Sequence, residues 1–232
     1  MAFHLDGIVP WGRNFDEYRR MFALETTDLA GRILDCGGGP ACFVADAAAA
    51  GHDVVAADPL YAAPPDAIRA RIDETADEVL RQVRANTGAY VWDRIPSPEA
   101  LRSVRLGAMD RFLDDYAGPD RAGRYVAAAL PRLPFGDGAF DLALVSHLLF
   151  TYSEHLDGAA HLAAVHELLR VARRVRIFPL VTLANDPSPH VDFLQDRLRG
   201  IGYDMRIREV DYRFQRDGNR MVEVATAWDS TN

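Results

Sequence analysis

The residues with the clearest potential for chemistry form a glycine-rich corner that is followed, further along the chain, by a carboxylate. The run DCGGGPA occupies residues 35–41, and Asp58 stands nineteen residues after Gly39. Glycines permit positive φ angles and let a ligand approach the backbone without a Cβ in the way. A carboxylate at the end of the next strand can accept hydrogen bonds from both hydroxyls of a ribose. The two features together predict a nucleotide site more strongly than either does alone.

Two details of this corner favour a sulfonium nucleotide over a dinucleotide. A dinucleotide fingerprint leaves the helix N-terminus free for a pyrophosphate, whereas here Pro40 directly follows the glycines and Asp35 precedes them. The carboxylate of Asp35 would repel a pyrophosphate, but it suits a ligand that carries an amino group and a sulfonium. S-adenosylmethionine has both groups, and we expect it to be the ligand.

A second set of reactive side chains follows the apolar run FDLALVS at residues 140–146. Ser146 ends this run, His147 comes next and Tyr152 lies five residues further on. Ligands of open α/β sheets lie at the carboxyl ends of the strands, so we expect Ser146 to lie near the ligand. His147 is a candidate general base, although a hydrogen-bonded histidine at a helix start would have the same sequence pattern. Tyr152 is a second catalytic candidate, for which a structural role is the alternative.

The elements around these residues predict an α/β fold. Apolar runs at 32–36 and 53–57 flank an alanine-rich helix at 41–50, which makes a βαβ unit and requires a parallel sheet covered on both faces. Two β-rich runs, residues 203–215 and 220–228, surround the turn residues RDGN and predict an antiparallel hairpin.

Further helices are predicted before and after the strand at 140–146. Residues 66–85 and a helix capped by Ser97 carry apolar stripes, and we expect residues 61–124 to be a helical insertion over the mouth of the sheet. A purely structural cover is the alternative. A later helix leads into a strand at 175–183, and a helix capped by Ser188 follows it.

The composition excludes several classes of protein. The 232 residues carry a formal charge of −8, and all 26 basic residues are arginine, which excludes lysine Schiff bases and the P-loop lysine. The arginines are scattered among acidic residues, so no basic surface for nucleic-acid binding is expected.

The two cysteines, Cys36 and Cys42, have no partners at the spacing of metal ligands, so we expect packed thiols and no metal site. No apolar run approaches ~18 residues, and the start does not read as a signal peptide, so we expect one cytoplasmic domain, residues 1–232, with no membrane partner.

The motifs resemble those of class I S-adenosylmethionine-dependent methyltransferases. ILDCGGGPA is similar to the glycine loop of that family, Asp58 matches its ribose-binding acid, and LPRLPFGDGAFDLALVSHLLF resembles its later motif pair. The likeness covers residues 13–60 and 125–227. It implies a Rossmann-like, seven-stranded methyltransferase sheet with an antiparallel C-terminal hairpin, interrupted after the second strand by the helical insertion.

The resemblance also implies positions for the cofactor. In this family the N-terminal segment, here residues 1–30, folds over the cofactor, and Arg13 would form a bidentate pair with the methionine carboxylate, although a surface ion pair is equally compatible with the sequence. Ala129 and Leu130 stand where the family often has an acid beside the adenine. The expected cofactor-binding residues are Arg13, Tyr18, Asp35, Cys36, Gly37, Gly39, Asp58, Pro59, Ala129, Leu130 and Ser146.

We therefore expect a methyltransferase that uses S-adenosylmethionine and acts on a small-molecule acceptor. The composition suggests a bacterial source, and we expect a monomer or homodimer in small-molecule or natural-product metabolism. Two alternatives remain open. One is an enzyme that consumes S-adenosylmethionine without methyl transfer, a cyclase or lyase that releases methylthioadenosine. The other is a non-catalytic protein that only binds S-adenosylmethionine.

Overall fold

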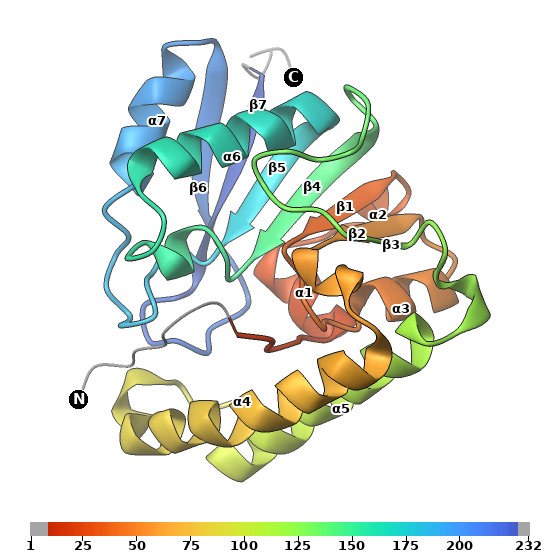
Figure 1. Ribbon diagram of the computed structural model, residues 1–232. Coiled ribbons are helices and arrows are strands. Elements are labelled where there is room, and N and C mark those ends of the chain that lie inside the picture. Colours follow the sequence, from red (N-terminus) through yellow and green to blue (C-terminus); the bar gives the residue numbers. More distant parts are fainter. Residues whose placement is uncertain (1–8, 227–232) are drawn as a thin grey trace.

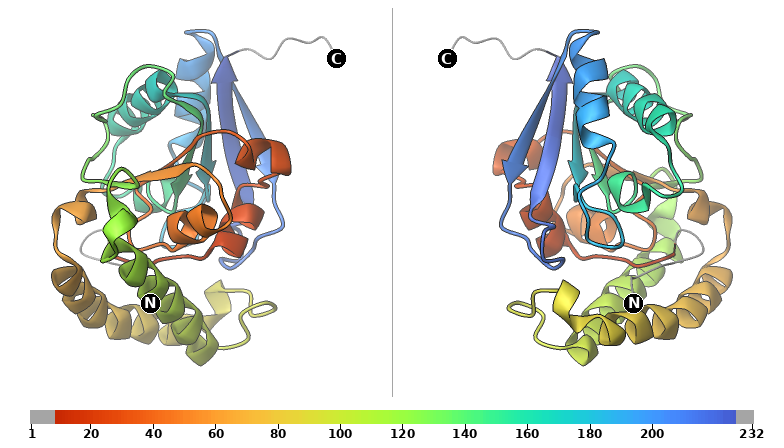
Figure 2. Two further views of the ribbon diagram at one scale, coloured as in Figure 1. Left: turned by 90° about the vertical axis from the view of Figure 1, so that its right-hand side faces the viewer. Right: turned by 90° about the vertical axis from the view of Figure 1, so that its left-hand side faces the viewer.

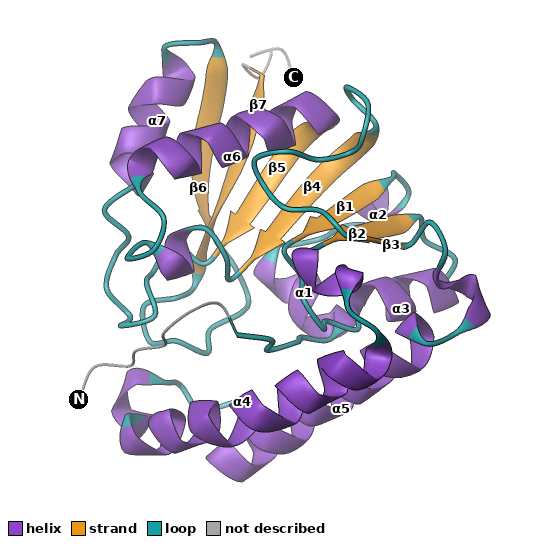
Figure 3. Cartoon of the chain, in the orientation of Figure 1, coloured by secondary structure: helices purple, strands orange, loops and turns teal. Residues whose placement is uncertain are grey.

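A seven-stranded mixed sheet forms the centre of the computed structural model, which describes residues 9–226 (Figures 1 and 3). The strand order is β3-β2-β1-β4-β5-β7-β6. The first five strands run parallel, and β7 pairs antiparallel with both β5 and β6. This confirms the predicted sheet and its reversed C-terminal hairpin. The strands are β1 (Ile33–Cys36), β2 (Val54–Ala57), β3 (Tyr125–Val126), β4 (Phe140–Ser146), β5 (Ala172–Phe178), β6 (Tyr203–Glu209) and β7 (Arg220–Thr226).

Helices cover both faces of the sheet, with α1, α2 and α3 on one side and α6 and α7 on the other (Figure 2). Side chains alternate along a strand, so Ile33 packs into the core beneath α1 and α3, and Leu34 packs into the core beneath α6. Every residue of β1 is therefore buried, as a doubly covered parallel sheet requires. The helices are α1 (Phe15–Met21), α2 (Thr26–Leu29), α3 (Phe43–Ala49), α4 (Pro65–Ala85), α5 (Pro98–Tyr116), α6 (Gly158–Val171) and α7 (Val191–Arg199).

The helices α4 and α5 lie between β2 and β3 in the chain and across the carboxyl end of the parallel strands in space (Figure 1). Ser97 caps α5 as expected, because its side chain accepts a hydrogen bond from the Ala100 amide at 3.1 Å. The predicted apolar stripe of α5 is largely buried. Val104 is only partly buried, however, and the neighbouring Arg105 is buried in its place.

The connection between β6 and β7 differs from the predicted tight turn. The strands end at Glu209 and begin again at Arg220, and residues 210–219 fold back onto the insertion. There the amide of Val91 donates to the carbonyl of Phe214 at 2.8 Å. The hairpin was predicted correctly, but its turn was not, because the aromatic residues of this connection are buried against the insertion.

Three other boundaries also differ. The strand predicted at 175–183 runs from Ala172 to Phe178 and ends where Pro179 cannot donate to the sheet. The helix after it begins at Val191 without a side-chain cap, and Ser188 instead bonds to Ser153 at 2.8 Å. The predicted strand tail at 227–228 and residues 1–8 of the N-terminal segment lie outside the described residues. Across residues 9–226, the structure holds no helix with the length and apolarity needed to span a membrane.

Candidate functional site

A cavity of about 620 Å³ opens at the carboxyl end of the parallel strands, under the α4–α5 insertion. Its size falls in the range of about 300–1,000 Å³ that is typical of small-molecule sites. The structure brings to its wall all but one of the residues singled out from the sequence. These are Arg13, Tyr18, Cys36, Gly37, Gly39, Asp58, Pro59, Ala129, Leu130, Ser146, His147 and Tyr152.

The glycine corner forms one side of the cavity with bare backbone. Gly37 and Gly39 have φ angles of 72° and 53°, in the left-handed region that side chains disfavour. A Cβ at Gly37 would also lie 2.4 Å from Cδ2 of Leu148. The conformation therefore favours glycine at this position, and a Cβ there would also displace the end of the Leu148 side chain.

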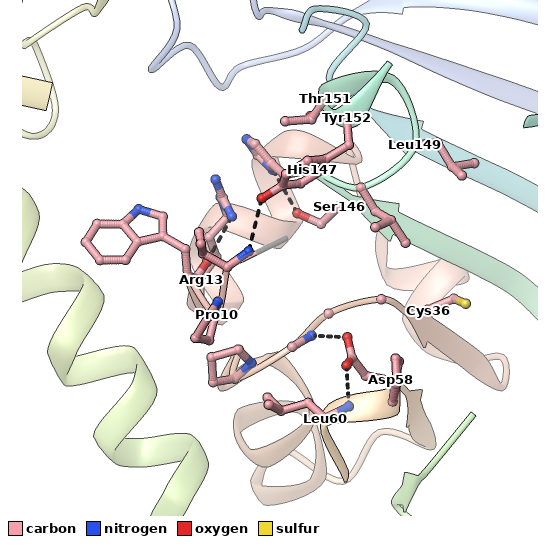
Figure 4. A pocket seen from close by; sticks show the side chains of 18 of the residues that line it. Pro10, Arg13, Cys36, Asp58, Leu60, Ser146, His147, Leu149, Thr151 and Tyr152 are labelled. Carbon is pink, nitrogen blue, oxygen red and sulfur yellow. Dashed lines mark hydrogen bonds between the residues drawn. The ribbon is translucent and has the colours of Figure 1, made fainter. Parts of the chain in front are cut away.

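The corner holds Asp58 in a defined orientation (Figure 4). Its Oδ2 accepts from the Gly39 amide at 3.0 Å, and its Oδ1 accepts from the Leu60 amide at 2.8 Å. Burial raises the pKa of Asp58, while these two N–H donors favour the charged form. Each carboxylate oxygen keeps a second lone pair. Asp58 can thus accept two further hydrogen bonds from a diol.

Asp35 lies behind the corner and not in the cavity. It is 1% exposed, both of its oxygens accept from the Tyr18 hydroxyl at 3.0 and 3.1 Å, and a Cβ on Gly38 would lie 2.1 Å from Oδ2. Burial raises its pKa to about 7, against the hydrogen bond from Tyr18 and with the help of the Asp58 charge. Side chains alternate along β1, and the Asp35 side chain is directed toward α1, so it does not line the cavity as the sequence suggested.

His147 stands at the end of β4 in a strained backbone conformation, with a φ of 51°. Its Nδ1 lies 3.0 Å from Oγ of Ser146 (Figure 4). Its ring meets the Phe178 ring edge-on, with the ring centroids 5.3 Å apart. Burial lowers the pKa of His147 well below its usual value, and the charges of Arg13 and Arg105 act in the same direction. The imidazole is therefore neutral at pH 7. With Nδ1–H donating to Ser146, Nε2 is free to accept a proton.

Arg13 places a partly buried cation at the cavity wall. Its Nη1 donates to the carbonyl of Trp11 at 3.1 Å, and its Nε has no hydrogen-bond partner. Burial and the charge of Arg105 lower the pKa of Arg13. Between residues 9 and 226, no carboxylate lies within ion-pair distance of this guanidinium. A partly buried guanidinium with an unpaired N–H can form a charge-assisted hydrogen bond with an anionic group of a ligand.

Tyr152 forms part of the opposite wall and ties down the N-terminal segment. Its hydroxyl accepts a hydrogen bond from the Val9 amide at 3.3 Å, and its side chain is buried (Figure 4). Burial raises the pKa of Tyr152, so the hydroxyl stays neutral and can only donate or accept a hydrogen bond. The hydrogen bond to Val9 gives this residue a structural role, and its catalytic role stays a prediction.

Sequence reasoning missed a buried cluster beside the cavity, made of Glu17, Arg105 and Tyr212. Arg105 and Glu17 form two hydrogen bonds at 2.6 and 2.7 Å, and the Tyr212 hydroxyl donates to Glu17 at 2.9 Å. The cluster joins α1, α5 and the β6–β7 connection. Burial opposes the charge of Glu17, but the charge and hydrogen bonds of Arg105 outweigh it and lower the pKa of Glu17 to about 2. One feature of the sequence could have indicated the cluster. Arg105 stands four residues after Leu101, on the apolar stripe of its helix, where a charged residue requires a buried partner.

The sequence also did not identify the apolar residues that line the cavity on the insertion side. They come from α4, α5, the N-terminal segment and the β6–β7 connection, and they include Trp11, Val79, Val83, Tyr90, Leu101 and Phe214. In the described part of the chain, no group of three histidine, cysteine or acidic side chains is arranged to hold a metal ion. Both Cys36 and Cys42 are buried and unpaired in disulfides, and burial raises the pKa of each thiol.

Comparison with known proteins gives one sequence relative and several distant structures. No family model matches the chain. It is 29% identical over 222 residues to uncharacterized protein MJ0045 of Methanocaldococcus jannaschii, covering 95% of this chain and 97% of that protein.

Among solved structures, mitomycin 7-O-methyltransferase MmcR is 13% identical with a TM-score of 0.45, and the match covers 92% of this chain and 54% of MmcR. This chain thus spans about half the length of MmcR. Magnesium protoporphyrin IX methyltransferase ChlM from Synechocystis PCC 6803, with bound SAH, is 14% identical with a TM-score of 0.46, over 92% of this chain and 94% of ChlM. The similarity to the Methanocaldococcus jannaschii protein extends over nearly the whole of both chains.

Proposed function

We propose that this protein is an S-adenosylmethionine-dependent methyltransferase that acts on a small-molecule acceptor. The observation that carries the proposal is that one cavity holds both a cation and an anchored carboxylate beside the glycine corner. Among residues 9–226, the cation has no carboxylate partner. Arg13 suits the carboxylate of the methionine half, and Asp58 suits the two ribose hydroxyls.

The remaining walls agree with such a ligand. The backbone of Gly37 and Gly39 lets the methionine half approach closely, and the apolar side chains of Pro59, Ala129 and Leu130 can enclose an adenine. An enclosed apolar site also excludes water from a charged sulfur centre. When bound, S-adenosylmethionine supplies an electrophilic methyl group on a positively charged sulfur. Ser146 orients His147, whose free Nε2 would take the proton from an acceptor during the transfer.

The cavity favours methyl transfer over the alternatives because it extends past the residues assigned to the cofactor. The apolar wall contributed by α4 and α5 would have no role in an enzyme whose substrate is S-adenosylmethionine alone.

A product assay tests the choice between these functions. Binding of S-adenosylmethionine and S-adenosylhomocysteine is measured by calorimetry, and the protein is then incubated with S-adenosylmethionine with and without a small-molecule cell extract. We expect S-adenosylhomocysteine to form only when extract is present. Methylthioadenosine in the absence of extract would establish self-reaction, binding without turnover would establish a non-catalytic protein, and absence of binding would reject all three functions.

We expect Asp58→Ala to weaken S-adenosylhomocysteine binding by about 1–3 kcal/mol, which is about five- to 150-fold, because hydrogen bonds to a charged group are lost. The measurement is calorimetry at constant pH. Asp53→Ala is the matched control, since Asp53 precedes the same strand at its other end and its side chain is 65% exposed. An Asp58 variant with the affinity of the control would remove Asp58 from the ribose site.

A further inference from the structure

The cavity contains a second compartment that the cofactor residues do not fill. We call it the apolar compartment and define it by Trp11, Val79, Val83, Tyr90, Leu101 and Phe214, which all line the cavity. These residues pack as one apolar cluster, and two of them, Trp11 and Phe214, also pack against the core beneath α1 and α3. The compartment is therefore a wall built by the insertion, the N-terminal segment and the β6–β7 connection together.

The apolar compartment offers no unpaired charge to a ligand. Of the cavity-lining residues that the structure describes, those with a formal charge are Arg13, Asp58 and Arg71. The first two are assigned to the cofactor. The Arg71 side chain is 54% exposed and lies 3.3 Å from Glu74, so its charge is already compensated and solvated. Burial raises the pKa of Tyr90 to about 12, which keeps its hydroxyl neutral. A charged group placed here would lose its hydration without gaining a partner.

The walls of the compartment suit a flat apolar molecule. The rings of Tyr90 and Phe214 stack with their centroids 4.9 Å apart, and the Trp92 ring meets Phe214 edge-on at 5.5 Å. Aromatic side chains held in this way present rigid apolar surface, and burying apolar surface of a ligand against it is favourable.

We propose that the apolar compartment binds the methyl acceptor, and that this acceptor is an uncharged, largely apolar molecule with one reactive hydroxyl group. This inference rests on the proposed function. The hydroxyl oxygen forms the new bond to the methyl carbon, the sulfur–methyl bond breaks, and its electron pair converts the sulfonium to a neutral thioether. The hydroxyl proton goes to Nε2 of His147. The methylated product is then a neutral ether, and no charge is left on it within the compartment.

The charge of the acceptor is tested with three probes that share one ring system: 1-naphthol, 1-naphthoate and 1-naphthylmethylammonium. Each is titrated into the unaltered protein saturated with S-adenosylhomocysteine, and binding is followed by calorimetry. We expect 1-naphthol to bind at least tenfold more tightly than either charged probe. Equal or tighter binding of a charged probe would overturn the proposal. Binding of S-adenosylhomocysteine alone, measured first, separates this outcome from a failure of the proposed function.

The location of the site is tested by filling the compartment. Val83→Trp should weaken 1-naphthol binding at least tenfold while S-adenosylhomocysteine affinity stays within twofold, and Ala70→Trp, on the exposed side of the same helix, should change neither. Unchanged 1-naphthol binding in a folded Val83→Trp protein would place the acceptor elsewhere. If that variant does not fold, Leu101→Ala, which widens the compartment, should also change the 1-naphthol affinity, and the three-probe comparison on the unaltered protein decides the acceptor charge by itself.

Discussion

Glu17→Gln should lower the free energy of unfolding by about 3–5 kcal/mol, because it leaves the buried guanidinium of Arg105 without its counter-charge. Arg105 is 1% exposed and Glu17 is 5% exposed, so solvent cannot replace the lost interaction. The measurement is equilibrium unfolding in urea at pH 7. Glutamine retains one oxygen to accept from the Asn14 amide, but its NH2 group replaces the oxygen that accepts from Arg105 and from the Tyr212 hydroxyl, so the substitution removes the charge and these two hydrogen bonds.

The double variant Glu17→Gln/Arg105→Met should recover much of this loss, since it removes both charges from the interior. Glu99→Gln is the control, because Glu99 forms an exposed ion pair with Arg84 and such pairs contribute about 0–1 kcal/mol. If Glu17→Gln and Glu99→Gln lowered the free energy of unfolding equally, the buried cluster would stabilise the protein no more than an exposed ion pair does.

The contribution of Glu17 should also depend on pH in a defined direction. Its pKa is lowered to about 2 in the folded protein, against about 4.3 in an unfolded chain. A lowered carboxyl pKa means that the stabilisation is complete above the unfolded value and is lost as the pH falls toward the folded one. The stability difference between wild type and Glu17→Gln should therefore be constant near pH 7 and should shrink between about pH 5 and pH 2.

His147→Asn should lower kcat by about 10²–10⁴-fold, the range expected for loss of a general base, while leaving S-adenosylhomocysteine binding nearly unchanged. Asparagine is the appropriate replacement because it tolerates the left-handed conformation at this position better than most residues. The rate is measured with the acceptor that the product assay yields. His155→Ala, an exposed histidine on the following segment, is the matched control.

The pH profile gives an independent check on His147. Its pKa is lowered well below 6.5 by burial and then by the charges of Arg13 and Arg105, so the basic form dominates throughout the neutral range. Between pH 6.5 and pH 8, protonation of His147 should not lower kcat/KM. The decrease of kcat/KM on the acidic side should begin only at a clearly lower pH. A kcat/KM profile that falls with an ordinary histidine pKa would show that the base is a different group.

The sequence was sufficient for the parts of the structure that depend on local pattern. Apolar runs identified β1, β2 and β4, and the spacing from the glycine corner to Asp58 placed both at one edge of the sheet. The strand β3 was not predicted, since its two half-buried residues are too short a run to show any periodicity.

Other features depend on contacts between distant residues. The hydrogen-bond partner of Asp35 is the Tyr18 hydroxyl, and nothing near Asp35 in the sequence indicates that partner. Arg105 breaks the rule that charged residues of a helix face solvent, and only the approach of Glu17 from another element makes its burial possible. The tight turn predicted between β6 and β7 was wrong for the same reason. The Phe214 carbonyl is held by a hydrogen bond from the Val91 amide in the insertion, which is distant in the sequence.

The Glu17–Arg105–Tyr212 cluster has a consequence for the order of folding. Glu17 and Tyr212 are hydrogen-bonded across a separation of 195 residues, so the wall of the cavity joins segments from near both ends of the chain. Contacts of such long range form only after most of the conformational search is complete. A chain emerging from the ribosome can therefore assemble the early strands, but it cannot complete the cavity until the β6–β7 connection has been synthesised. Only a chain that has reached the native state therefore has the complete cavity and can bind the ligand. A bound ligand selectively stabilises full-length, correctly folded chains.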